Sequence, residues 1–247
     1  MSSEANLSGA ALAALLWLCS ACASAHDLIT AEAAERYLAQ ADRHLAVLKS
    51  KDALPLRAEA SYALGRLLDE VRDLLNRDLA AHGRLQGLPT EYLVGALQGR
   101  GVRLQVDPDR GRYPANLRYY RDALALAPDG VHAGDAELRL LQGYFYDSFT
   151  DDPLQPRAQS WRRLQEQILT GERFLHRNPQ HAEREEAEFI LAVHYVQAAR
   201  SGPDSTTRFT YAERARRSAA DFRARHPDSM RVAAIDVLME SLPARGR

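Results

Sequence analysis

Cysteine and lysine are the residues that this sequence nearly lacks. Its two cysteines, Cys19 and Cys22, both lie near the start. A chain cleaved after Ala25 therefore has no thiol for a disulfide, a nucleophile or a metal site. Only Lys49 and Lys51 are lysines, and the chain balances 32 basic against 33 acidic residues. This balance argues against a nucleic-acid partner, because proteins that bind nucleic acid carry a basic excess.

Catalytic motifs are absent as well. The sequence contains no His-Glu-x-x-His, phosphate-binding loop, Gly-x-Ser-x-Gly or haem-attachment motif. The acidic run from Glu183 to Glu188 opens a predicted helix, where carboxylates favour the positive end of the helix dipole; acid–base chemistry by paired carboxylates is the alternative. We therefore predict a protein that is not an enzyme and that holds no cofactor or metal in its folded part.

The first 25 residues are predicted to be a signal peptide. A stretch of small and apolar residues, Ala10 to Ala25, ends in Ala23-Ser24-Ala25, the pattern of a cleavage site. It is too short to span a membrane, and no other long apolar run follows. We expect an exported, periplasmic protein, although no basic residue precedes the apolar stretch. Lipidation at Cys22 is the alternative and would anchor the chain in the outer membrane.

His26 supports a second hypothesis. Cleavage after Ala25 would place the terminal amine beside the His26 imidazole, and the two together can chelate copper. Cleavage after Ala23 would instead leave Ser24-Ala25-His26, whose nitrogens suit Cu(II) in a square plane. The alternative function is therefore a small-ligand or copper-binding helical protein that uses its processed N-terminus.

Residues 26–98 are predicted to form an N-terminal helical hairpin region. Thr30 is a candidate N-cap, a second helix opens near Pro55 and ends by Gly83, and residues 89–98 form a short helix. Residues 99–113 are expected to be a loop or linker, because they include the turn sequence Asp107-Pro108-Asp109-Arg110-Gly111.

Residues 114–247 are predicted to form a helical repeat region. Apolar faces at helical spacing predict helices at 114–127, 132–149, 156–177, 181–200, 207–225 and 228–242. No strand-rich segment interrupts them, so the predicted fold class is all-α.

A phrase recurs in this region. Phe174-Leu-His-Arg-Asn-Pro179 and Phe222-Arg-Ala-Arg-His-Pro227 each place an aromatic residue five positions before a proline, and Tyr120 to Pro128 forms a related phrase. Repetition of a helix–turn–helix unit is typical of an α-solenoid, which offers its curved face to a partner.

The phrase Tyr120-Arg-Asp-Ala123-Leu-Ala-Leu-Ala-Pro128 resembles the second helix of a tetratricopeptide unit, and His226-Pro-Asp-Ser229 resembles a junction common in exported members of that family. These members include outer-membrane assembly lipoproteins and cell-envelope coordinators. The successive prolines lie 51 and 48 residues apart, whereas the family period is about 34. The resemblance implies an array of helical hairpins that acts as a non-catalytic scaffold; an irregular helical bundle is the alternative.

The predicted binding surface lies on the first helices of two units. The densest aromatic cluster, from Gly143 to Phe149, lies within the predicted helix 132–149, and tyrosines supply a large contact area with a polar tip. We expect a protein or peptide partner in the cell envelope; packing of the aromatic cluster between neighbouring helix pairs is the alternative. The predicted contact residues are Tyr144, Tyr146, Phe149, Tyr195 and Arg200.

Overall fold

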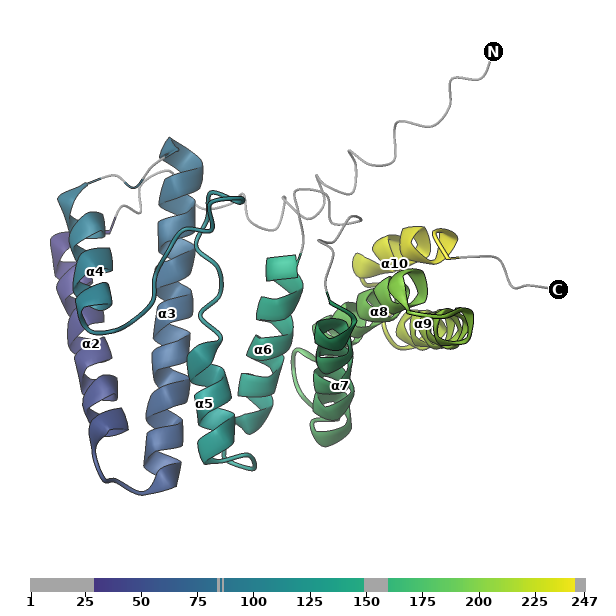
Figure 1. Cartoon of the computed structure of the whole chain (residues 1–247), viewed down its shortest axis with the longest axis horizontal. Helices are drawn as coiled ribbons and strands as arrows, with labels where there is room; N and C mark the ends of the chain where they lie inside the picture. The colour runs from purple at the N-terminus through teal and green to yellow at the C-terminus, as the bar shows by residue number, and fades with distance from the viewer. Residues whose placement is uncertain (1–28, 84, 86, 149–159, 243–247) are drawn as a thin grey trace, which may run out of the picture. The chain divides into compact units, whose positions relative to one another are not determined.

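The computed structural model describes residues 29–83, 85, 87–148 and 160–242, and these residues confirm the predicted all-α class (Figure 1). Within them, the only extended pairing is a single antiparallel bridge between Asp107 and Arg112. Their nine helices are α2 (Ala31–Lys49), α3 (Leu54–His82), α4 (Leu88–Gly99), α5 (Arg118–Leu126), α6 (Ala133–Ser148), α7 (Trp161–Arg177), α8 (Arg184–Ser201), α9 (Ser205–Arg225) and α10 (Arg231–Glu240).

The chain divides into two compact units. His26–Asp147 form the N-terminal unit, and Ser148–Arg247 belong to the C-terminal unit. The first unit therefore contains α2 to α6, and the second contains α7 to α10. Each unit has its own packing and is considered separately.

The predicted boundaries of the first two helices are confirmed. The Thr30 hydroxyl accepts a hydrogen bond of 3.1 Å from the Ala33 N–H and so caps α2. Pro55 lies in the first turn of α3, where its missing N–H costs no helical hydrogen bond. Gly83 ends α3 with φ of 71°, a left-handed conformation that glycine adopts without steric cost.

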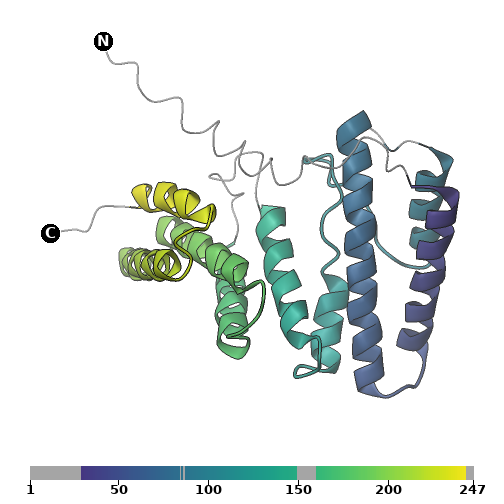
Figure 2. The ribbon, with the colours of Figure 1, turned by 180° about the vertical axis from the view of Figure 1, so that it is seen from behind.

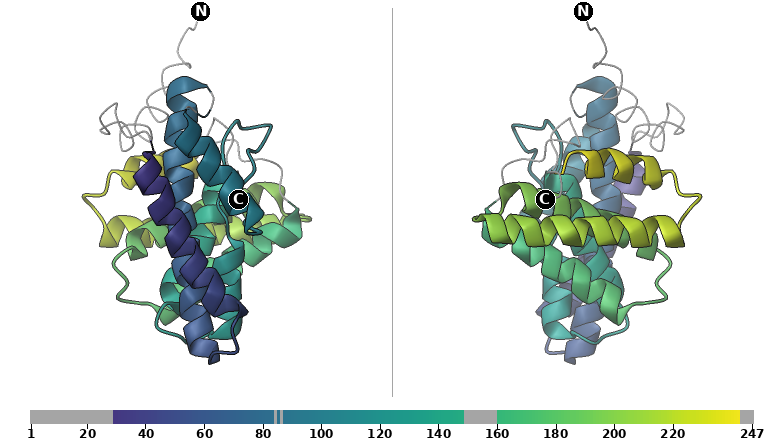
Figure 3. Two further views of the ribbon diagram at one scale, coloured as in Figure 1. Left: turned by 90° about the vertical axis from the view of Figure 1, so that its left-hand side faces the viewer. Right: turned by 90° about the vertical axis from the view of Figure 1, so that its right-hand side faces the viewer.

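Helix α3 is the central element of the N-terminal unit. It has α2 and α4 on one side and α5 and α6 on the other (Figures 2 and 3). Both of its long faces are therefore buried. The face towards α2 and α4 belongs to an aliphatic cluster that includes Leu38, Leu64, Leu68, Val71, Leu75, Leu93 and Leu97.

The opposite face of α3 holds α5 at close range. The Ser61 hydroxyl donates a 2.8 Å hydrogen bond to the Tyr119 carbonyl. A Cβ atom on Gly65 would lie 2.9 Å from Cε1 of Tyr120, so only glycine fits there. The Tyr120 hydroxyl reaches past Gly65 and donates a 2.5 Å hydrogen bond to Asp69. Burial raises the pKa of both Tyr120 and Asp69.

Residues 99–113, where the sequence places a linker, pack into the N-terminal unit. Val102, Leu104 and Tyr113 are buried in the same cluster as the aliphatic face of α3. The Asn76 side chain holds the end of the segment, since it donates to the Tyr113 carbonyl at 3.0 Å and accepts from the Tyr113 N–H at 2.7 Å. The segment has the irregular backbone of a loop, but the boundary between the compact units falls after Asp147.

Helix α8 is the central element of the C-terminal unit and packs against α7, α9 and α10 (Figure 3, right). Every residue from Ala187 to Ala199 is buried. This explains why its apolar residues follow no single stripe: a helix covered on several sides has no one face that must be apolar. Helix α9 meets the core through small residues and one ring, namely Ala212, Ala215, Ala219 and Phe222.

The recurring phrase corresponds to a recurring turn after α5, α7 and α9. In each turn, the residue before the proline donates its N–H to the carbonyl of the residue five positions before the proline. These hydrogen bonds are Ala127 to Ala123 at 2.9 Å, Asn178 to Phe174 at 2.9 Å and His226 to Phe222 at 2.8 Å.

The same turns share a second and a third hydrogen bond. In the second, the residue two positions after the proline donates its N–H to the carbonyl of the residue before the proline. These bonds are Gly130 to Ala127, His181 to Asn178 and Ser229 to His226, at 3.1, 3.2 and 3.1 Å. The next bond starts the following helix: Ala133 to Gly130, Arg184 to His181 and Val232 to Ser229, at 2.9, 3.1 and 3.1 Å. The three turns therefore have one backbone design.

Two buried positions ahead of each proline hold one large and one small side chain, but which position holds the large one differs between the helices. The residues eight and five positions before the proline are buried in all three cases, and each pair combines one aromatic and one small residue. The pairs are Tyr120 with Ala123, Gly171 with Phe174, and Ala219 with Phe222. Gly171 is small because its aromatic counterpart lies one helical turn further along the chain.

Replacing Gly65 with alanine tests the close approach of α3 and α5. We expect Gly65→Ala to lower the free energy of unfolding by about 1–3 kcal/mol, because the new methyl group displaces the Tyr120 ring. Gly95→Ala is the matched control, since a Cβ at Gly95 of α4 meets no atom within 4 Å, and helix propensity alone should stabilise it by up to about 1 kcal/mol. Urea denaturation measures both, and equal effects would contradict the proposed contact.

Candidate functional site

Two of the predicted contact residues lie on α6 of the N-terminal unit. Tyr144 is half-buried and packs against the cluster of Tyr62, Leu117 and Tyr120. Tyr146 is 50% exposed, and its ring meets the Phe145 ring edge to face at 5.2 Å. Of these two tyrosines, Tyr146 is the more exposed to solvent. The predicted residue Phe149 lies outside the described residues.

The other two predicted residues lie on α8 of the C-terminal unit. Tyr195 is buried, and its hydroxyl donates a 2.8 Å hydrogen bond to Glu172 of α7. Burial, followed by the Glu172 carboxylate, raises the pKa of this phenol. Arg214 of α9 donates to the same carboxylate oxygen at 2.9 Å. Tyr195 thus ties three helices together, whereas Arg200 is exposed near the end of α8.

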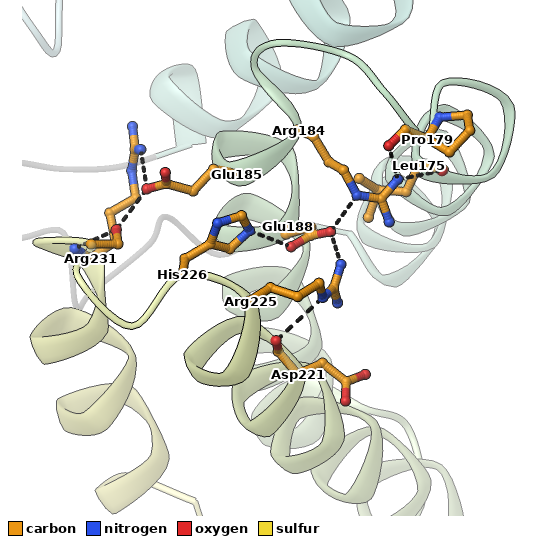
Figure 4. Close-up of polar contacts among 10 residues, drawn as sticks. Leu175, Pro179, Arg184, Glu185, Glu188, Asp221, Arg225, His226 and Arg231 are labelled. Carbon is orange, nitrogen blue, oxygen red and sulfur yellow. Dashed lines mark hydrogen bonds and ion pairs between the residues drawn. The ribbon is translucent and has the colours of Figure 1, made fainter.

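The densest polar network lies where α8 begins and α9 ends (Figure 4). At its centre, the Glu188 side chain is only 4% exposed. One of its carboxylate oxygens accepts hydrogen bonds from Arg184 Nε, at 2.7 Å, and from Arg225 Nη1. The other oxygen lies 3.0 Å from Nε2 of His226.

A second carboxylate extends this network to the start of α10. Glu185 accepts hydrogen bonds from the Ser229 hydroxyl at 2.6 Å and from Arg231 at 3.1 Å (Figure 4). These hydrogen bonds, that of Ser229 first, hold the pKa of Glu185 below its usual value. Arg184 also donates to the carbonyls of Leu175 and Pro179, so that the turn after α7 is bound to the same network.

The contacts of this network hold helices and turns together. Both oxygens of Glu188 already have partners, and burial keeps solvent away from them, so the carboxylate is poorly placed to take a proton from a substrate. The network joins the repeated turn after α9 to the first turns of α8. Sequence reasoning assigned the acidic run to the helix dipole, with acid–base chemistry as the alternative, and did not predict an ion pair. The spacing of Arg184 and Glu188, one helical turn apart, is the signal that could have indicated an ion pair.

Surface hollows of the N-terminal unit are further candidates for a binding site. The first measures about 170 Å³ and is mostly apolar. It lies among the start of α3, the end of α5 and the start of α6, where the His132 ring stacks on Tyr62 at 4.3 Å. Val131, on its wall, is 95% exposed. Its wall consists of Pro55, Ala58, Glu59, Ala123, Leu124, Ala127, Gly130, Val131, His132, Ala133 and Ala136.

The second hollow is polar and measures about 510 Å³. It lies beside the start of α5 and will be called the arginine hollow. Its wall consists of Arg103, Asn116, Arg118, Tyr119, Arg121 and Asp122. Sequence reasoning did not identify it, because Arg103 comes from the segment interpreted as a linker.

In the described part of the chain, no three His, Cys, Asp or Glu side chains are grouped so that they could hold a metal ion. Nor does this part contain a helix with the length and apolar composition needed to cross a bilayer. Burial lowers the pKa of His194 to about 4, so that its ring is neutral at pH 7. His26 and Cys22 lie outside the described residues.

Removing the Glu188 carboxylate tests the role of the network. Glu188→Ala should lower the free energy of unfolding by about 1–3 kcal/mol, because it removes a buried carboxylate that accepts charged hydrogen bonds from Arg184 and Arg225, whose guanidinium groups keep contact with solvent. Glu166→Ala is the control, since its ion pair with Arg162 is exposed and should contribute at most about 0.5 kcal/mol. Thermal and urea unfolding measure both variants; a loss at Glu188 no larger than at Glu166 would contradict the assignment.

No protein-family model, curated protein or solved structure matches this chain at a significant level. The function must therefore be inferred from the chain's own residues. Three features carry that inference: the repeated turn, the exposed ring of Tyr146 and the arginine hollow.

Proposed function

We propose that this protein is an exported scaffold of the tetratricopeptide-like type, which binds a protein or peptide partner in the cell envelope and catalyses no reaction. The observation that carries the proposal is the turn found after α5, α7 and α9, with the same three backbone hydrogen bonds each time. A repeated helix–turn–helix element is the building unit of solenoids, and solenoids are binding scaffolds.

The side chains around the turns support the tetratricopeptide-like assignment. In that family, the second helix of a unit buries an aromatic and a small residue ahead of its terminal proline. Here the same two positions are buried in α5, α7 and α9, with the aromatic residue at either one. The interval of 48 residues between Pro179 and Pro227 is long because α8 and α9 alone contain 18 and 21 residues.

The binding surface that we propose includes the aromatic face of α6. Tyr146 provides an exposed ring for contact with a partner, and the half-buried Tyr144 supports the same face. Arg200, which is exposed on α8 of the C-terminal unit, remains a separate candidate contact of that unit, and Phe149 remains a predicted contact that lies outside the described residues. We assign Tyr195 a supporting role, since its ring is buried and its hydroxyl is bound to Glu172.

Peptide selection tests this surface. We would select binders for the purified protein from a display library of random twelve-residue peptides and measure their dissociation constants by fluorescence anisotropy. Tyr146→Ala should weaken binding by about fivefold or more, as expected when an aromatic contact worth over 1 kcal/mol is lost. Tyr92→Ala, which removes a ring 53% exposed on α4 of the same unit, should change the affinity by less than about twofold. Failure to select any binder, or equal losses in both variants, would count against the proposed function.

The intact mass of the protein in the cell-envelope fraction tests export. We expect the mass of residues 26–247, because Ala23-Ser24-Ala25 fits a cleavage site. A chain that starts at Cys22 with added acyl chains would support export with an outer-membrane anchor. A chain that starts at Met1 would overturn the exported part of the proposal.

The same measurement can eliminate the copper hypothesis. A mature chain that begins at His26 or at Ser24 keeps the proposed chelating terminus, whereas a start beyond His26 removes it.

A further inference from the structure

The arginine hollow concentrates positive charge on the N-terminal unit. Arg103, Arg118 and Arg121 are all exposed and line one hollow of about 510 Å³. The only acidic residue in its wall is Asp122. Three guanidinium groups against one carboxylate leave an excess of two positive charges.

The packing of the N-terminal unit holds the backbone segments that carry these arginines. Val102 and Leu104 are buried in the core, so that Arg103 between them faces solvent. The Asn116 side chain donates a 3.2 Å hydrogen bond to the Arg103 carbonyl and thereby holds this segment beside the start of α5. On α5, the guanidinium of Arg118 lies 5.8 Å from the centre of the Tyr119 ring, and that ring is buried against the core.

The positive charges are poorly neutralised within the protein. Among the described residues, Arg103 and Arg121 form no ion pair, and Arg118 makes only a 3.5 Å pair with Asp122 in which both side chains are well exposed. Other arginines of the same unit have close partners: Arg72 pairs with Asp69 at 2.9 Å, and Arg100 pairs with Asp42 at 2.7 Å.

Two of these arginines, Arg118 and Arg121, lie in the first turn of α5, where the helix dipole adds to their positive potential. The first turn of α5 contains no acidic residue, although acidic residues are favoured at the positive end of a helix and cations are not. An anionic partner would relieve this repulsion.

We propose that the arginine hollow binds an acidic segment of a partner protein, whose carboxylates pair with Arg103 and Arg121. The guanidinium group matches a carboxylate with two parallel hydrogen bonds. The hollow is within the size range of ligand sites, roughly 300–1,000 Å³, and is large for a single small anion. This inference rests on the proposed scaffold function, and it names the chemistry of the partner.

The test uses a fluorescein-labelled octapeptide of glutamate and serine in equal parts, with a lysine–serine octapeptide as the charge control. Its dissociation constant for the purified protein is measured by fluorescence anisotropy at low and high salt. We expect saturable binding of the acidic peptide alone, weakened by salt. Arg103→Gln and Arg121→Gln should each raise the dissociation constant about fivefold, as expected for the loss of a charged hydrogen bond.

Two control variants make the result specific. Arg43→Gln removes the same charge from an exposed position on α2 of the same unit and should change the dissociation constant by less than about twofold. Asp122→Asn removes the only acidic side chain in the wall and should tighten binding. Circular dichroism would verify the fold of each variant.

The inference would be overturned if the acidic peptide showed no saturable binding, or if Arg43→Gln and Arg103→Gln weakened its binding equally. Displacement of the peptide by low millimolar inorganic phosphate would also overturn it, because the site would then bind a small anion. So would arginine-dependent binding to phosphatidylglycerol vesicles in place of the peptide. The Tyr146-dependent binding of selected peptides is measured separately. Loss of the acidic site with that binding intact would therefore refute this inference alone.

Discussion

The backbone hydrogen bond that closes each helix ahead of its proline is the constraint on which the architecture depends. Proline has no N–H and disfavours helical geometry in the residue before it, so the helix must end there. The N–H of the preceding residue then binds back into the helix, and two further bonds start the next one. Because the bonds recur after α5, α7 and α9, the backbone leaves one helix and begins the next with the same hydrogen bonds each time.

Much of the fold could be predicted from local chemistry, because its signals are local. The cap at Thr30, the proline in the first turn of α3 and the left-handed Gly83 are each determined by one residue and its neighbours. Two of the three recurring turns were equally visible, as a phenylalanine five positions before a proline, and the turn after α5 was visible as a related phrase with its tyrosine eight positions before the proline. The burial of residues 99–113 was not, because it depends on Asn76, which is distant in sequence and holds Tyr113. Likewise, α8 has no apolar stripe that could indicate its central place.

The candidate site shows the same division. The chemistry of Tyr146 and Tyr195 could be recognised from residue type, but their exposure could not. Tyr195 is buried because Glu172 and Arg214, on two other helices, converge on its hydroxyl. Glu188 became the centre of a network because Arg225 and His226 return to it from the end of α9. The apolar periodicity of a single helix cannot predict such partners, because they come from other helices.

The exchange of large and small side chains ahead of each proline has a consequence for how this chain can evolve. In each helix the two buried positions together hold one aromatic and one small residue, so we expect a change of volume at one position to be tolerated best when the other compensates for it. Descendants can therefore drift between the two arrangements through compensating double changes. A sequence profile that scores each position independently would mix the aromatic-first and the small-first arrangements and would detect neither. Covariation between the two positions would still reveal the repeat.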